Sequence, residues 1–405
     1  MANTLKFGNS EWYGSEGNIL AYNDLGGNFK PLPFTLSRGS SATRVNQQGL
    51  IETVGANNAR VDYLDNANGA MLLEPQRLNY VTQSETFTGY WGLQGASLIA
   101  DNNVKNPTGN TFSNILNTTT TGTFKSINKN ESSAWDSKTL TVSCFAKKIT
   151  NDYIYFYNIG SPSGVNGTWF NINDGTLGVS GGAWSNEKIE NYGNGWYRCS
   201  AKITFGTDTN YIYINNSRGN NNSSSNAGDQ TYIWGTQIEE GSYATSYIPS
   251  LSGSAVTRLK DTCTQTTPSG VIGQTEGVVY MDFIAQKTDG QSQSHFWLGA
   301  SSNEIGLYGG SQFVLYSSGG VQINGGNIVN GQRYKVAFGY KANDYVAYIN
   351  GTQVGTDTSA TVPTMSGLAL GGYFNGNEVQ KKNISDFKLY NTRLSNSELA
   401  ALTQV

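Results

Sequence analysis

The chain contains a single histidine, His295, in the segment QSQSHFWLG. Strand alternation would place His295 and Trp297 on one face, and no serine or cysteine nucleophile motif accompanies them. One GxSxG match occurs, at residues 178–182, but no helical pattern follows it, so the strand–turn–helix site of a catalytic serine is absent. The HExxH and paired-cysteine patterns of zinc sites and the GxxxxGK[ST] phosphate loop are absent as well. We therefore expect no catalytic centre of these kinds.

Glycan cleavage would need two carboxyl groups that face one cleft, because one acts as an acid while the other acts as a nucleophile or base. Glu187 and Glu190 are three residues apart, and Glu239 and Glu240 are adjacent, so neither pair shares one face of a strand. We expect these four to be solvated surface acids. The sequence thus predicts no catalytic residue and a protein that is not an enzyme. A glycan depolymerase with scattered acids is the alternative.

Aromatic side chains are the best candidates for ligand contact, because an exposed ring stacks on the C–H face of a pyranose. Trp184 in VSGGAWSNEKIE and Trp135 in NESSAWDSK lie in turn-like surroundings. Tyr308 and Tyr373 each lie beside a Gly-Gly pair. We predict glycan contacts at these four positions. Packing at a sandwich rim or at a subunit interface is the alternative.

Metal and cofactor sites have little support in the sequence. Asp and Glu are thinly spread and form no cluster with ligand spacing, so a structural Ca²⁺ stays open and no ligands are assigned to it. We expect no other cofactor. The three cysteines, Cys144, Cys199 and Cys263, are far apart, and we expect them to be small buried side chains that form no disulfide.

The charge and hydropathy of the chain exclude two classes of partner. Charged residues make up 14% of the 405 residues, and the formal net charge is −3. Such a chain has no electrostatic reason to bind nucleic acid or an anionic membrane surface. No segment approaches the roughly 18 consecutive apolar residues of a membrane-spanning helix, and the N-terminal residues lack a signal-peptide pattern. We expect synthesis in a cytoplasm and no membrane insertion.

The elements that must position these residues are predicted to be β-strands joined by short polar turns. Alternating or aromatic-rich segments form two groups: 139–149, 152–160, 167–173, 195–205, 210–216 and 230–240, then 278–285, 294–300, 312–318, 332–341, 344–354, 368–374 and 384–391. Asn350-Gly351 predicts a type I′ hairpin, and Gly49 within 42–54 predicts another turn with positive φ. Ser395, with Glu398 three residues later, predicts one short C-terminal helix.

The predicted organisation is an all-β chain with two tandem sandwiches. Residues 1–81 are polar and turn-rich, with too few apolar residues for a core of their own. We predict an irregular attachment or oligomerisation segment there, which wraps a neighbouring domain or orders against another copy or a partner. A jelly-roll sandwich over 82–263 and a lectin-like sandwich over 264–405 follow.

Three stretches carry a resemblance to known proteins. TLSRGSSATRVNQQGLIETVGANNARVDYL with LLEPQRLNYV resembles a segment near the start of many phage fibre and spike proteins. GNGWYRCSAKITF with IWGTQIEEGSYATSYIPSLSGSAVTRLKDT is similar to the closing half of a carbohydrate-binding-module-like jelly roll in such proteins. RYKVAFGYKANDYVAYINGTQV with ISDFKLYNTRLSNSELAAL resembles the concanavalin/laminin-G-like sandwich. Together they cover most of the chain.

The resemblance implies a structural protein on the virion surface of a tailed bacteriophage, as a head fibre, spike or capsid decoration. It would be assembled in the bacterial host cytoplasm, bind other capsid or tail proteins, and form a homo-oligomer, commonly a trimer. Polysaccharide would be its ligand. A tail-fibre or tail-tip receptor-binding component is the second placement. A bacterial surface lectin is a further alternative, which the missing export signal disfavours. No catalytic residue is carried over.

Overall fold

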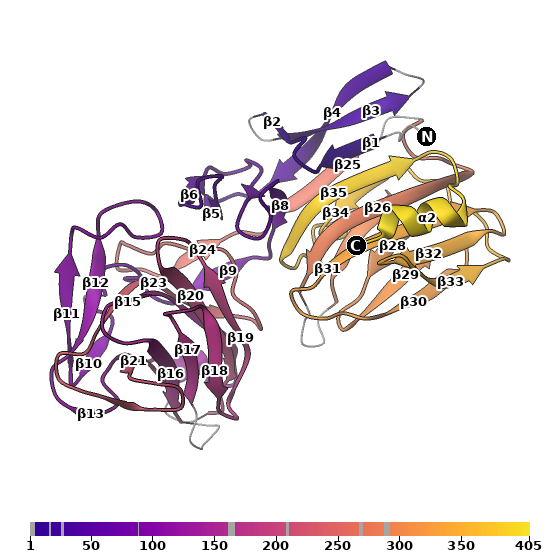
Figure 1. Ribbon diagram of the computed structural model, residues 1–405. Coiled ribbons are helices and arrows are strands. Elements are labelled where there is room, and N and C mark those ends of the chain that lie inside the picture. The colour runs from indigo at the N-terminus through magenta and orange to yellow at the C-terminus, as the bar shows by residue number, and fades with distance from the viewer. Residues whose placement is uncertain are drawn as a thin grey trace. The chain divides into compact units, whose positions relative to one another are not determined.

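The computed structural model describes residues 5–405 except 16–17, 26–27, 88, 161–166, 208–209, 267–269, 287–291 and 301. The chain divides into two compact units. Unit 1 contains residues 1–47, 53–76 and 259–405, and unit 2 contains residues 48–52 and 77–258. Both are built from antiparallel strands (Figure 1), so the prediction of an all-β chain with two β-sandwiches is confirmed.

Unit 2 is a sandwich of two six-stranded sheets, with strand orders β10-β14-β21-β16-β17-β18 and β11-β12-β23-β15-β20-β19. Alternation sends one face of each sheet inward, so that Ile154 and Phe156 of β16 and Val142 and Cys144 of β15 are fully buried in one core. The bounds in unit 2 are β9 Arg77–Asn79, β10 Gly92–Gln94, β11 Ala96–Asp101, β12 Ser113–Thr118, β13 Gly122–Thr123, β14 Ser126–Asn130, α1 Ser132–Trp135, β15 Thr139–Lys148, β16 Tyr153–Ile159, β17 Gly167–Asn171, β18 Thr176–Ser180, β19 Trp184–Asn191, β20 Trp196–Thr204, β21 Tyr211–Ser217, β22 Ser224–Ser225, β23 Gln230–Glu240 and β24 Val256–Arg258.

Unit 1 combines strands from both ends of the chain. Its N-terminal strands are β1 Leu5–Gly8, β2 Tyr13–Ser15, β3 Asn18–Leu25, β4 Asn28–Ser37, β7 Val61–Asp62 and β8 Ala70–Leu73. Its C-terminal elements are β25 Thr262–Thr266, β26 Glu276–Ala285, β27 Ser294–Ala300, β28 Asn303–Tyr308, β29 Gln312–Ser317, β30 Val321–Asn327, β31 Arg333–Lys341, β32 Tyr345–Ile349, β33 Thr352–Asp357, β34 Gly367–Leu370, β35 Lys382–Tyr390 and α2 Asn396–Thr403.

The strands of unit 1 form one continuous ladder that folds into two layers. Hydrogen-bonded neighbours run β33-β32-β31-β26-β35-β1-β3-β4 and continue as β25-β34-β27-β28-β29-β30. Side chains from both halves of this ladder, such as Phe338 of β31 and Leu307 of β28, are buried in one core. Helix α2 packs on the outer side of the first half, where Leu399 joins Val278 and Val346 in a smaller cluster.

Residues 1–81 hold more regular structure than the sequence predicted. Phe7 of β1 pairs with Phe387 of β35, and Leu36 of β4 pairs with Cys263 of β25 (Figure 1, indigo strands beside β25 and β35). These side chains are buried in the core of unit 1, because a segment with so few apolar residues needs the C-terminal strands to cover them. We predicted divisions at 81/82 and 263/264. The main divisions between the units lie at 76/77 and 258/259 instead, and most of the first segment, residues 1–47 and 53–76, belongs to unit 1.

The local predictions about turns and the helix are confirmed. Asn350 and Gly351 have φ values of 50° and 79°, as a type I′ turn requires, and Ile349 pairs with Thr352 across it. Gly49 also has a positive φ, 77°, between β5 (Ala42–Val45) and β6 (Ile51–Val54). Ser395 caps α2 in a capping box with Glu398.

The three cysteines are buried free thiols, as expected. Within the part of the chain that the structure describes, no helix is long and apolar enough to cross a membrane.

Candidate functional site

The two tryptophans predicted to contact glycans are buried in unit 2. Trp135 is 0% exposed and stacks on Phe205 with ring centroids 6.0 Å apart. Trp184 is 4% exposed and packs against Phe156. The turn-like sequences around both residues are real, but α1 and the first residue of β19 turn the indoles into the core. The prediction of exposed stacking surfaces is therefore wrong for this pair, and the alternative of packing describes them.

Tyr308 and Tyr373, the other two predicted residues, lie together at Trp297 in unit 1. The ring of Tyr308 stacks on Trp297 at 5.7 Å between centroids and 20° between planes, and Tyr373 meets Trp297 edge-on at 5.2 Å. Tyr316 completes the cluster, 6.1 Å from Trp297 and 6.3 Å from Tyr308. Trp297 is 5% exposed, whereas the three tyrosines are half-buried. We call these four residues the aromatic face.

The register of the strands explains how the aromatic face forms. Along β28, Ile305 and Leu307 point into the core, so Glu304, Gly306 and Tyr308 must point outward. Trp297 of β27 lies directly opposite Gly306, which in turn lies opposite Tyr316 of β29. Period-two alternation on three neighbouring strands thus collects these rings on the outer face of one layer.

Gly306 is small because the indole of Trp297 lies across it. A Cβ atom at residue 306 would lie 2.3 Å from Cε3 of Trp297, so any larger residue must displace that ring. We expect Gly306→Ala to lower the free energy of unfolding by about 1–3 kcal/mol through overpacking and to change the near-UV circular dichroism of the indole. Gly182→Ala is the matched control, because no heavy atom lies within 4 Å of a Cβ there. Equal small effects in both variants would contradict this account.

His295 does not share a face with Trp297, contrary to the prediction. The pairing of β27 with β28 shifts register between Ser294 and Phe296, which makes His295 the extra residue of a β-bulge. Its ring is 0% exposed and packs against Phe283 and Phe313 of the core. Burial, and then Lys382, hold the pKa of His295 well below its ordinary value. A neutral imidazole in an aromatic core has no access to a substrate.

Polar groups border the aromatic face. The hydroxyl of Tyr373 donates to Oε2 of Glu304 at 2.7 Å, and burial together with this hydrogen bond raises the pKa of Tyr373 to about 12. Gln322 and Asn324 of β30 continue the outward rows beyond Tyr316 and are exposed. Among the described residues, the buried indole N–H of Trp297 has no hydrogen-bond acceptor. Donors and acceptors for sugar hydroxyls are thus present beside stacking rings.

Sequence reasoning missed Trp297, Tyr316 and Glu304 as members of this face. The alternation Glu304-x-Gly306-x-Tyr308 could have placed Glu304 beside Tyr308. Trp297 could not be placed in this way, because the bulge at His295 reverses the alternation of β27.

The acids considered for glycan cleavage are not all surface groups. Glu239 is 0% exposed and accepts hydrogen bonds from the backbone N–H and the hydroxyl of Thr245 at 2.8 and 2.6 Å. Glu190 is 7% exposed and pairs with Lys188. Both bind neighbouring groups of unit 2, so the prediction of solvated acids is wrong for these two.

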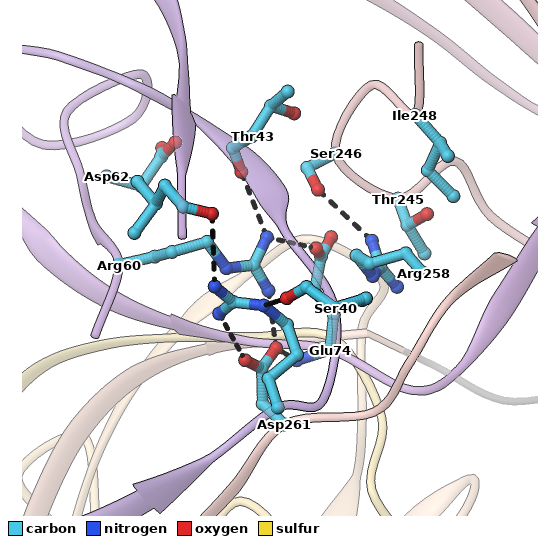
Figure 2. A network of polar contacts seen from close by, with 12 residues as sticks. Ser40, Thr43, Arg60, Asp62, Glu74, Thr245, Ser246, Ile248, Arg258 and Asp261 are labelled. Atoms are coloured by element: carbon cyan, nitrogen blue, oxygen red, sulfur yellow. Dashed lines mark hydrogen bonds and ion pairs between the residues drawn. The ribbon is translucent and has the colours of Figure 1, made fainter. Parts of the chain in front are cut away.

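A buried network of two arginines and two acids occupies another part of unit 1. Nη1 of Arg60 donates to Oε2 of Glu74 at 2.8 Å, and its Nη2 donates to Asp261 (Figure 2). Arg38 donates to the other oxygen of Asp261 at 2.9 Å. All four side chains are 0% exposed. Burial lowers the pKa of Arg38, whereas Asp261 and Glu74 outweigh burial and raise that of Arg60.

The residues of the network lie in two of the three stretches that carry the resemblance. Arg38 and Arg60 lie in the first stretch, Glu74 in LLEPQRLNYV and Asp261 in the segment that ends in RLKDT. Their charges balance, and they join backbone segments up to 223 residues apart. In this structure the four residues link distant backbone segments of unit 1. Arg258, from the same stretch, bonds Ser246 within unit 2 (Figure 2).

Metal ligands are not gathered in the described residues: no group of three or more His, Cys, Asp or Glu side chains could hold an ion there. The calcium site therefore stays a prediction without ligands.

No protein-family model matches the chain, and no curated protein matches it. The botulinum neurotoxin serotype G binding domain is a similar solved structure, at 10% identity over 35% of this chain and 39% of that one, with a TM-score of 0.30. The Ruminococcus gnavus IT-sialidase CBM40 bound to α2,3-sialyllactose shares 16% identity over 33% of this chain and 84% of that one, with a TM-score of 0.28. The Trypanosoma rangeli sialidase in complex with sialic acid shares 10% identity over 94% of this chain and 65% of that one, with a TM-score of 0.30. The chain spans about two fifths of the length of the neurotoxin domain. Likeness at this level says nothing about a ligand.

Proposed function

We propose that this protein is a non-catalytic adhesion protein that binds glycans through the aromatic face of unit 1. The observation that carries the proposal is the position of Tyr308, Tyr316 and Tyr373, half-exposed around a buried Trp297 on the outer side of a sheet. Flat rings pack against sugar C–H groups, and the neighbouring amides and carboxylate bind the hydroxyls. A rigid strand scaffold fixes these groups before the ligand arrives.

The proposed place of action is the virion surface of a tailed bacteriophage, as a head fibre, spike or capsid decoration. The resemblance of three stretches supports this placement, and a tail-fibre or tail-tip component is the second candidate. Several copies, as in a trimer, would make weak glycan contacts useful through avidity. Immunogold labelling of purified particles tests the placement: label on capsids supports a head protein, whereas label on tails supports the second candidate. Absence of the protein from particles contradicts both.

Binding should depend on the tyrosines of the aromatic face. We expect the double substitution Tyr308→Ala and Tyr316→Ala to weaken binding to a host-surface polysaccharide at least tenfold, because each stacking ring contributes about 0.5–1.5 kcal/mol beyond its buried area. Affinity electrophoresis of the full chain measures the loss of retardation. Tyr390→Ala is the control, since Tyr390 lies on β35 beside the cluster of α2 and should leave binding unchanged.

Two outcomes contradict the proposal. Equal binding by the wild-type protein and the double variant would remove the aromatic face as the site. Release of reducing ends from the polysaccharide, lost on replacing one acid, would instead support the glycan depolymerase alternative.

A further inference from the structure

The charged groups beside the aromatic face are mainly acidic. Glu304 lies on β28 two residues from Gly306, on the same outward face as Tyr308. Glu378 is exposed and close enough to Tyr373 that both carboxylates help to raise the pKa of its hydroxyl, after burial. One oxygen of Glu304 accepts the hydrogen bond from Tyr373, and its other oxygen has no partner among the described residues. A carboxylate oxygen thus borders the stacking rings and is free to accept hydrogen bonds.

Two lysines lie near this edge, and Lys382 attracts Glu378 but is not paired with Glu304. Nζ of Lys260 donates to the backbone oxygen of Gly376, on the turn that follows Tyr373. Lys382 is 0% exposed, and its Nζ donates to Gln293 at 3.2 Å, so it lies inside the unit. Burial lowers the pKa of Lys382 to about 7, which leaves only part of its charge at neutral pH.

We propose that the aromatic face selects sugars without acidic groups and rejects sialic acids, uronic acids and phosphorylated sugars. This inference rests on the proposed glycan-binding function. Sugar hydroxyls donate to a carboxylate, so Glu304 binds a neutral sugar with a charge-assisted hydrogen bond. An acidic sugar on the same rings would place a second negative charge beside Glu304 and Glu378, and like charges held together in an interface repel each other and weaken binding.

The spacing along β28 indicates a ligand longer than one sugar ring. Glu304 and Tyr308 are four residues apart on one strand face, which places their Cα atoms about 13–14 Å apart. Trp297 lies between them, opposite Gly306. A ligand of more than one sugar ring therefore fits the length of the face between Tyr308 and Glu304.

A glycan array that carries sialylated and desialylated forms of the same oligosaccharides tests this selection on the full chain. We expect the wild-type protein to bind the desialylated forms at least tenfold more strongly. In the Glu304→Gln variant with Glu378→Gln, the ratio of acidic to neutral binding should rise at least fivefold, because the repulsion is removed and the neutral forms lose the charge-assisted hydrogen bond. High salt should reduce the difference in the wild-type protein, because ions screen exposed charges.

The outcomes separate this inference from the function on which it rests. Binding of neither form to the array or to a neutral galactomannan contradicts the glycan-binding function itself. Equal or stronger binding of sialylated forms, still lost in the Tyr308→Ala, Tyr316→Ala variant, keeps that function and overturns the charge selection. Glu276→Gln is the matched control. Glu276 lies on β26 and pairs with Lys341 of β31, and neither strand belongs to the aromatic face.

Discussion

Replacing Asp261 with asparagine lowers the free energy of unfolding of unit 1 by about 3–5 kcal/mol. Asp261 is the shared acceptor of the buried network, since it binds Arg38, Arg60 and, at 2.9 Å, the backbone N–H of Glu74. Without its charge, two buried guanidinium groups face one carboxylate. The excess positive charge then remains in a low-dielectric interior, away from water. The loss of unfolding free energy is measured by unfolding in urea, with hydrogen exchange of peptides from unit 1 as the readout.

The control is Asp344→Asn, the same chemical change in a surface ion pair. Asp344 is 3.2 Å from Arg393 and its side chain is 54% exposed, so we expect a loss of about 0–1 kcal/mol there. A second variant, Arg38→Met combined with Asp261→Leu, removes charge of both signs. It should cost less than Asp261→Asn, because no unmatched charge is left. If Asp261→Asn costs no more than the surface control, the network does not hold unit 1 together.

We expect unit 1 to become more stable as the pH rises from about 7 towards 9, below the range in which the buried Cys263 thiol opposes the gain. Burial is the main cause that lowers the pKa of Lys382 from 10.5 to about 7, against an opposing effect of Glu378. Between these two values the unfolded chain binds a proton that the folded chain does not, so stability must increase with pH. The slope is at most about 1.4 kcal/mol per pH unit for one proton. This stability is fully present above the unfolded pKa and lost as the pH falls to about 7.

The variant Lys382→Met should abolish this alkaline dependence. Denaturant unfolding at several pH values measures its free energy of unfolding. The variant His295→Phe tests a second pH range, below 6.5. The pKa of His295 is held below 6.5, so the wild-type protein should lose stability as the pH falls below that value, and His295→Phe should remove this acid loss while the alkaline rise remains. A wild-type protein whose stability is flat between pH 7 and 9 would show that Lys382 keeps its charge when folded.

The sequence predicted the features that depend on neighbouring residues. The Asn350-Gly351 turn and the Ser395 cap of α2 appear where their motifs stand, because a few consecutive residues settle the backbone conformation there. The strand groups of both sandwiches follow from alternation in the same way. Tyr308 and Tyr373 were found from their Gly-Gly neighbours, which indicated an outer position.

The place of residues 1–81 in the fold could not be predicted from local sequence patterns. Their few apolar side chains correctly indicated that this segment has no core of its own, but not which domain it completes. Phe7 and Leu36 are buried only because β35 and β25, far away in the sequence, pair with their strands. Pairing between distant strands depends on register and on the whole core, which no short window contains.

The sequence by itself determined an all-β protein with two sandwiches and a capped C-terminal helix. Only the tertiary structure decided which aromatic rings face outward. Trp135 and Trp184 stand in turn-like segments yet are buried, whereas Trp297 reaches the outer face because one bulge at His295 shifts the register of its strand. Exposure depends on what covers a side chain, and that cover comes from residues distant in the chain.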